Sequence, residues 1–343
     1  MKKSMKGVLT MPEKSAYNCS QLTAHSSPRI VSLDTAKGIA IILVVIGHEL
    51  QHRYGTDGLP FRLIYSFHMP LFMFLSGMVF SLKLRNFPSQ SLKPSREILK
   101  SARGLLIPFV CWTLVAALIR HRDNMAGYFL RVAESPDRSL WFLLVLFWCR
   151  AFFVLVHRVC ARAFRNLTAM KLAAVMAVMF VLMRLLAPGN FMGAGLFRAH
   201  FPYFALGVFA WQYRVRLSGF LADLPAVLAM IALFAVIAPC WHLTEPNPFS
   251  LAHGRVLFLI VRRLSPIPGI FLTLSLTRFL ARCATHAAVN ALCMTGTMTL
   301  GIYALHPYFL GMFPPVIAPL CVSVLLTVVI GRIPVMRVLL LGK

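Results

Sequence analysis

The sequence predicts an all-α fold, a polytopic bundle of about ten transmembrane helices with both termini in the cytoplasm. Hydrophobic residues make up 59% of the 343 residues and charged residues only 13%, whereas a soluble domain is about 25% charged. Apolar segments long enough to cross a bilayer recur along the chain. Lys and Arg crowd every second link between these segments, which is the pattern typical of cytoplasmic loops.

The expected elements follow in order from this alternation. Residues 1–28 are polar and contain lysines, so we expect a disordered cytoplasmic tail, followed by one membrane-embedded domain over residues 29–343. The net charge of +25 is spread over the cytoplasmic links, which argues against a nucleic-acid-binding face. The apolar segments fall at residues 31–51, 62–82, 103–120, 139–157, 170–187, 199–213, 220–240, 254–278, 286–310 and 314–331.

The eight cysteines show no paired spacing, and most lie inside apolar segments. We therefore expect small buried thiols without a disulfide framework. No cluster of His, Cys, Asp or Glu has the spacing of metal ligands, so no metal site is predicted.

Two ionisable residues lie inside the first apolar segment. The uncharged run between Lys37 and His48 is about ten residues, but a spanning helix needs roughly 20. Eleven steps of about 100° return His48 to within roughly 20° of Lys37, on one face and about 16 Å further along the helix. Because such residues usually face a bundle interior or a water-filled cavity, the pair predicts a polar path into the bilayer. Asp34 precedes Lys37 by one turn and can pair with it.

The second segment places His68 beside Pro70 near its outer entrance, where the histidine has either an interfacial structural role or a substrate contact. Ser76 and Gly77 allow another helix to approach closely. Trp141 begins the fourth segment at the outer side, and it reads either as a substrate contact or as an interfacial belt residue.

Two later segments also carry polar side chains. Arg262 and Arg263 lie within an apolar stretch and need anionic or carbonyl partners, so an anionic ligand and an acid from another helix are both open. Tyr303 and His306 lie one turn apart; they bind a sugar, order the main site or form part of an interfacial belt. Histidines toward the outer side and cations toward the inner side suit group transfer across the membrane, with the donor inside and the acceptor outside.

Five blocks of sequence carry a family resemblance: LDTAKGIAIILVVIGH, SFHMPLFMFLSGMVFS, SLWFLLVLFW, FPYFALGVFAW and GIYALHPYFL. In this order they closely resemble the acyltransferase-3 family of integral-membrane O-acyltransferases. The branch they resemble is the fucose 4-O-acetylase-like one, which includes exopolysaccharide acetyltransferases of the xanthan type.

The resemblance implies transfer of acetyl from cytoplasmic acetyl-CoA to a sugar hydroxyl at the outer side of the bacterial inner membrane, without a metal. The family signature is an arginine and a histidine separated by ten residues, and it maps onto Lys37 and catalytic His48. Lysine keeps the charge but loses the bidentate fork of arginine. By this resemblance Lys37, with Arg262 or Arg263, holds the CoA end or offsets charge on the oxyanion, while His48 acts as a general base or carries the acetyl group itself.

Other functions remain open at the level of sequence. A non-enzymatic exporter of polysaccharide or lipid-linked sugar would also need polar residues within the membrane. A different acyl group, a peptide or lipid acceptor, and an association with polysaccharide assembly machinery are equally compatible with the residues.

Overall fold

The computed structural model describes residues 31–84, 93–136, 140–186, 189–243 and 252–343, so the expected N-terminal tail lies outside the described part. In these residues the regular structure is helical throughout, as predicted. The α-helices are α1 (Val31–Tyr54), α2 (Leu59–Tyr65), α3 (His68–Leu82), α4 (Pro94–Arg120), α5 (Met125–Glu134), α6 (Trp141–Ala163), α7 (Ala169–Leu186), α8 (Ala194–Gln212), α9 (Arg214–Phe220), α10 (Leu224–Ile237), α11 (Ala252–Leu264), α12 (Pro266–Cys283), α13 (His286–Thr297), α14 (Thr299–Leu305), α15 (Ile317–Arg332) and α16 (Pro334–Leu341).

Six stretches of the described chain are long and apolar enough to cross a membrane. Two helix pairs bring this to eight if each pair is one span: α9 with the segment from Leu224 to Cys240, bent by 80°, and α13 with the segment from Thr299 to Tyr308, bent by 68°. The other two predicted segments correspond to α8 and to the shorter α15. The prediction of a membrane-spanning helical bundle is therefore confirmed, while the count of about ten spans and the cytoplasmic termini stay predictions.

Local sequence explains where several helices begin. The Asp223 side chain caps α10 by accepting a hydrogen bond from the Ala226 amide, and Thr285 caps α13 in the same way. Proline occupies the first turn of α4, α10 and α12, where its missing N–H costs nothing. These caps and prolines define where the helices begin, because the apolar sequence along the helices does not mark their ends.

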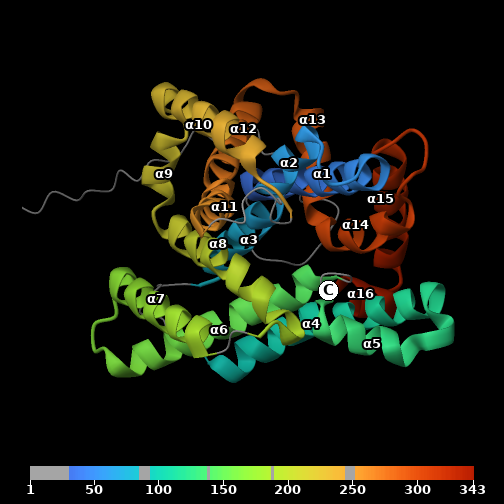
Figure 1. Ribbon diagram of the computed structural model, residues 1–343, viewed down its shortest axis with the longest axis horizontal. Helices are drawn as coiled ribbons and strands as arrows, with labels where there is room; N and C mark the ends of the chain where they lie inside the picture. The colour runs from blue at the N-terminus through green and yellow to red at the C-terminus, as the bar shows by residue number, and fades with distance from the viewer. Residues whose placement is uncertain (1–30, 85–92, 137–139, 187–188, 244–251) are drawn as a thin grey trace, which may run out of the picture.

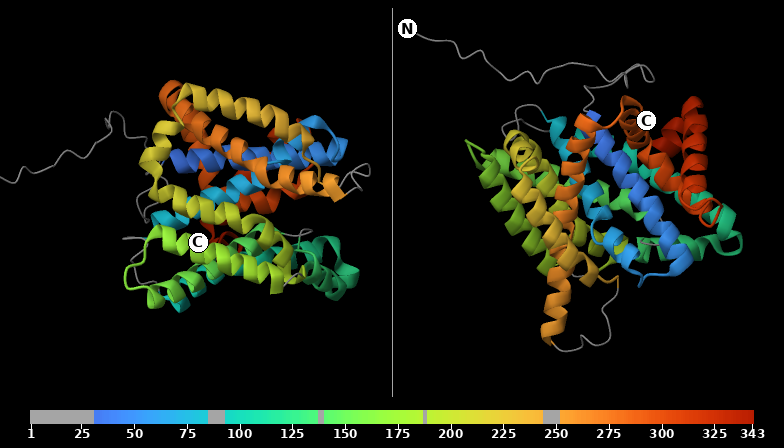
Figure 2. Two further views of the ribbon diagram at one scale, coloured as in Figure 1. Left: turned by 60° about the vertical axis from the view of Figure 1, so that its left-hand side comes forward. Right: turned by 90° about the horizontal axis from the view of Figure 1, so that it is seen from above.

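The helices form two groups with a shared middle (Figure 1). Helices α4 to α7, in green, lie on one side of the molecule, and α1 with α10 to α15 lies on the other. Helices α3 and α8 pack against each other between the two groups, and α8 also contacts α6. The second orientation in Figure 2 shows the same division, with the C-terminal α16 lying where it can touch α4.

Glycines bring the central helices into backbone contact. A methyl group at Gly77 of α3 would overlap the carbonyl of Phe204 in α8, and one at Gly207 of α8 would overlap the carbonyl of Phe74. The predicted role of Gly77 in close helix approach is therefore confirmed. Gly296 of α13 meets the Asp34 carbonyl of α1 in the same manner, which holds the end of α1 that carries Lys37.

Candidate active site

The structure joins two of the predicted site residues into one hydrogen-bonded pair. His48, on α1, and His306, at the start of the short 3₁₀ turn His306–Tyr308 that follows α14, lie with Nδ1 and Nε2 2.6 Å apart. Their rings are nearly parallel, with centroids separated by 4.9 Å and planes inclined by 8°. His306 is fully buried, whereas His48 is only partly buried. His48 is therefore the member of the pair that a substrate can meet.

The hydrogen bonds of His306 assign the tautomers of the neutral pair. Its Nδ1 lies 2.8 Å from the carbonyl oxygen of Ile302, which can only accept, so Nδ1 carries the hydrogen. The Nε2 of His306 is then an acceptor, and the Nδ1–H of His48 donates to it. This leaves the lone pair of His48 on Nε2, as a general base requires.

Aromatic side chains surround this pair. The ring of Tyr65 lies edge-on to His48 at 6.1 Å and to His68 at 4.5 Å, and its hydroxyl donates to Gln51 Oε1 at 2.6 Å. His68 is buried, with Nδ1 3.0 Å from the Ile64 carbonyl oxygen. Tyr65 therefore contacts both His68 and His48, which places His68 beside the pair. Sequence reasoning missed Tyr65.

A second side chain that sequence reasoning missed, Glu49, fixes the end of α1. Its carboxylate accepts from Arg53 Nε at 2.5 Å and from the Gly311 amide at 3.2 Å, and the side chain is almost completely buried. Arg53 in turn donates to the Met312 carbonyl at 3.2 Å. These bonds tie the turn that follows His48 to the loop that follows His306, so the segments beyond the two histidines are joined to each other. The signal available in the sequence was an i, i+4 Glu–Arg pair.

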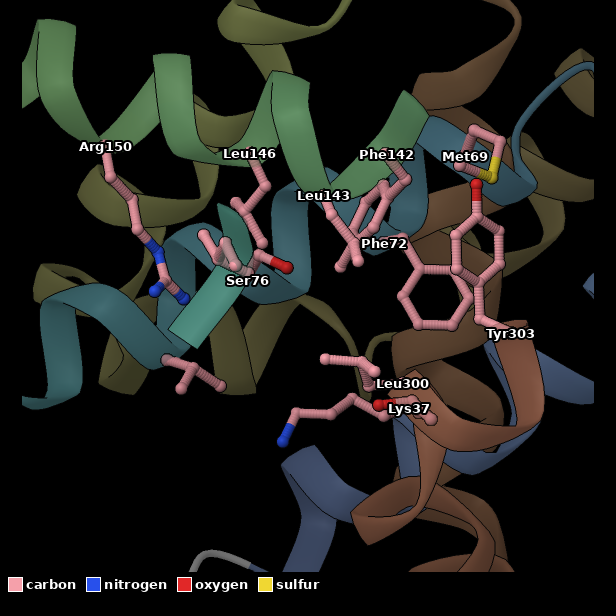
Figure 3. A pocket seen from close by; sticks show the side chains of 13 residues that line it. Lys37, Met69, Phe72, Ser76, Phe142, Leu143, Leu146, Arg150, Leu300 and Tyr303 are labelled. Atoms are coloured by element: carbon pink, nitrogen blue, oxygen red, sulfur yellow. The ribbon is translucent and has the colours of Figure 1, made fainter. Parts of the chain in front are cut away.

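Lys37 lines a cavity of about 190 Å³ that lies between the two helix groups (Figure 3). Its amine pairs with Asp34 Oδ1 at 2.7 Å, as the one-turn spacing predicts. Arg150 lies at one end of the cavity and Tyr303 at the other, and the Lys37 side chain points its amine away from Tyr303, toward the side of Arg150. The wall between them is mostly apolar and includes Ser76. The full lining is Lys37, Met69, Phe72, Ser76, Val79, Leu105, Phe142, Leu143, Leu146, Arg150, Thr299, Leu300 and Tyr303.

The cationic end of this cavity lies within an excess of positive charge. Lys83, directly after α3, has its pKa lowered by burial and then by the charges of Arg150, Lys100 and Lys37, with Glu97 acting in the opposite direction. Several cations thus stand close enough to repel one another. An anionic group bound at this end would relieve that repulsion.

Tyr303 connects the cavity with the histidine pair. Its ring lines the cavity and stands 6.2 Å from the ring of His306. Phe142 lies edge-on to Tyr303 at 5.8 Å, and Trp141 precedes it at the start of α6. The Trp141 ring itself lies 4.9 Å from His200, a residue that the sequence did not single out.

Arg262 and Arg263 do not join Lys37 in the structure, contrary to expectation. Arg263 donates to the carbonyl of Ala199 at 2.8 Å, and Arg262 lies over the ring of Trp241 at 5.8 Å. The need for a partner inside the membrane is met for Arg263 by a backbone carbonyl, which is neither the anionic ligand nor the acid from another helix that the sequence left open. Arg150 occupies the place by the cavity that was expected of them.

Among the residues that the structure describes, no three His, Cys, Asp or Glu side chains gather as metal ligands would.

Comparison with known proteins identifies the family that the chain matches. Residues 30–338 match the family described as "Acyltransferase domain". The chain is 30% identical to nodulation protein NolL of Sinorhizobium fredii over 250 residues, which is 68% of this chain and 62% of that protein. It is 37% identical to nodulation protein NolL of Mesorhizobium japonicum over 136 residues, or 36% of this chain and 35% of the relative. Both matches therefore span less than two thirds of the relative's length. No solved structure is significantly similar to the chain.

Proposed function

Because the chain belongs to the acyltransferase-3 family, a family of membrane acyltransferases, we propose that it moves an acetyl group from acetyl-CoA to a hydroxyl of a cell-surface or exopolysaccharide sugar. The observation that supports this proposal best is the bond between His48 and His306, which leaves a basic nitrogen on the partly exposed member. We place the protein in the bacterial inner membrane, with the end of α1 at Lys37 toward the cytoplasm.

The cavity of Lys37 suits the proposed donor. Acetyl-CoA supplies an activated thioester at the end of a long arm, with phosphates at the other end. Lys37 and Arg150 would bind the phosphates. The apolar wall would contact the arm as far as Tyr303, whose ring lies 6.2 Å from the ring of His306. The same cations can accept a phosphate as point charges, so lysine in place of the family's arginine is compatible with this role.

The histidine pair supplies the proton transfer. As the sugar oxygen bonds to the acetyl carbon, His48 Nε2 takes the hydroxyl proton, and the sulfur leaves with the electrons of the C–S bond. His306 then accepts a hydrogen bond from a positively charged His48, which stabilises that charge. His48 returns the proton to the sulfur, and the products are a sugar ester and a free thiol.

Replacing His48 tests this assignment. In a deletion strain that carries the His48→Ala variant, acetyl esters should form on the surface glycan about a thousandfold more slowly, because the general base is lost. Mass spectrometry of the glycan measures the esters and identifies the acyl group by its mass. His52→Ala is the matched control, since His52 is an exposed histidine on the same helix. Near-normal acetylation by membrane-inserted His48→Ala would refute the role.

The donor side has its own test. Lys37→Gln should raise the KM for acetyl-CoA by about tenfold, while Lys37→Arg keeps the charge and should stay near wild type. Initial rates in membranes at varied acetyl-CoA measure this, and Arg103→Gln, at an exposed position of α4, is the control. An inactive Lys37→Arg beside an active Lys37→Gln would contradict a role based on charge.

A further inference from the structure

A second cavity, of about 420 Å³, lies beside the short turn that contains His306. It is bounded by the end of α4, by α5 and by the turn His306–Tyr308. Ala304 faces this cavity, whereas the preceding Tyr303 faces the cavity of Lys37. The two cavities therefore lie on different sides of one helical turn.

Aromatic rings form much of the wall of this cavity. The rings of Trp112 and Tyr308 lie 6.5 Å apart, and His121 stacks on Tyr128 at 4.4 Å with the planes inclined by 18°. Flat aromatic faces with polar edges suit a ligand that has an apolar face and a polar rim, as a pyranose ring does.

The remaining polar groups of the wall are basic. Arg120 and Arg131 line the cavity, and none of the described lining residues is acidic. The Arg120 guanidinium lies 4.6 Å above the ring of Tyr308 and donates to the Pro307 carbonyl at 3.0 Å, so it is held in a fixed orientation. Guanidinium groups bind carboxylate and phosphate in a bidentate manner, which a neutral sugar cannot exploit.

The position of this cavity connects it with the chemistry. Pro307 and Tyr308 directly follow His306 in the chain, and Arg120 is bonded to that same turn. A ligand in the cavity thus lies beside the backbone that carries His306, the partner of His48. The cavity is also at the His48 end of α1, the end that we assign to the acceptor.

We propose that this cavity binds the acceptor saccharide, and that the acceptor carries an anionic group, a carboxylate or a phosphate, next to the ring that the aromatic wall holds. Arg120 and Arg131 bind the anion, and Tyr308 and Trp112 contact the sugar. The assignment of the ligand as an acceptor rests on the proposed acetyl transfer, but the binding itself can be measured without a donor.

Ligand-detected saturation-transfer NMR on the full chain in lipid nanodiscs tests the proposal. The probes are matched pairs: methyl glucoside with methyl glucuronide, methyl galactoside with methyl galacturonide, and each hexose with its 1-phosphate. At least one anionic member should bind about tenfold more tightly than its neutral partner, and Arg131→Gln should remove that difference. Tighter binding of the uronate would indicate an acidic glycan as the acceptor, and tighter binding of the sugar phosphate would indicate a phosphate-linked sugar.

Two controls keep the test specific. Arg122→Gln removes an exposed arginine from the same connection without touching the cavity wall, and it should leave binding unchanged. Tyr308→Phe should keep sugar binding, whereas Tyr308→Leu should weaken it for neutral and anionic probes alike.

Three results would overturn the proposal. These are equal binding of every neutral and anionic partner, binding that Arg120→Gln and Arg131→Gln both leave intact, and inorganic phosphate binding as tightly as the sugar phosphates. Specific binding by a chain that transfers no acetyl would refute the proposed function and leave the cavity's assignment standing. Acetyl transfer without saccharide binding at this cavity would refute the cavity's assignment and leave the proposed function standing.

Discussion

At the residue scale, a backbone carbonyl decides which nitrogen of His48, the proposed general base, is basic. The Ile302 oxygen holds the hydrogen of His306 on Nδ1, and His306 then orients His48 through a 2.6 Å contact. His306 acts through His48, so it is a positioning residue. The arrangement resembles other sites in which a second group fixes the tautomer of a catalytic imidazole.

This arrangement predicts different outcomes for two substitutions of His306. The Oε1 of His306→Gln can accept from His48 Nδ1–H, so this variant should keep more activity than His306→Leu, which should lose about a hundredfold or more in kcat. The pH dependence of kcat should move in both variants, because a contact of His48 has changed, and KM for acetyl-CoA should not. Equal activity of the two variants, with an unchanged pH profile, would mean that His306 only fills space.

The sequence predicted part of this site, and the reasons differ between residues. The shared face of Lys37 and His48 and the pairing of Asp34 follow from helix geometry alone. The contact between His48 and His306 joins residues 258 positions apart, so local pattern cannot predict it. Arg150 had a visible signal, since a charge inside an apolar segment is costly, but Arg262 and Arg263 carried the same signal and found other partners.

At the scale of elements, close backbone contacts hold α3 against α8 and α1 against α13. Gly77 and Gly296 allow these approaches, and the first was predictable from a small residue in an apolar segment. The bend between α13 and α14 was not predictable. No proline marks it, and residues 286–310 read as one continuous span until Met298 is seen outside the helical region at φ −103° and ψ 9°.

Adding one methyl group to α3 tests the contact with α8. Gly77→Ala should lower the free energy of unfolding by about 1–3 kcal/mol, because the methyl group meets a backbone carbonyl that cannot move aside. Thermal unfolding in detergent measures the loss. Gly219→Ala places the same methyl group in open space within α9, and helix propensity should make it neutral or stabilising by up to about 1 kcal/mol. Equal melting temperatures for the two variants would contradict a tight α3–α8 contact.

At the scale of the whole molecule, hydropathy predicted the helical bundle, whereas the count of about ten spans stays a prediction. Each of the ten predicted apolar segments corresponds to a helix or a bent pair, but α15 has only 16 residues and two pairs are broken. A long run of apolar residues shows that a segment avoids water. It does not show whether the segment forms one straight helix or two helices with a bend between them. The direction of the bundle rests on the charge of the links, which remains a prediction.

Cysteine labelling tests that direction. In a variant without its native cysteines, Asp57→Cys lies in the exposed link after α1 and Arg216→Cys lies in exposed α9. A membrane-impermeant maleimide should label position 57 in intact spheroplasts and position 216 only after lysis, because the basic link is held in the cytoplasm. Labelling of both positions after lysis is the control for reactivity. The reverse pattern in intact spheroplasts would invert the proposed sides of donor and acceptor.

The separation of Lys37 from His48 along α1 has an electrical consequence under the proposed function. An acetyl group passes outward to the sugar while the hydroxyl proton, held by His48, passes inward to the sulfur. The two exchange places, so one turnover moves no net charge and leaves the acidity of each compartment unchanged. Had the proton escaped to the outside, each turnover would have separated one charge, worth about 2.3 kcal/mol per 100 mV of membrane potential. Under the proposed mechanism the histidine pair, one member of which is fully buried, would let the thioester alone supply the energy for acetylation, whatever the membrane potential.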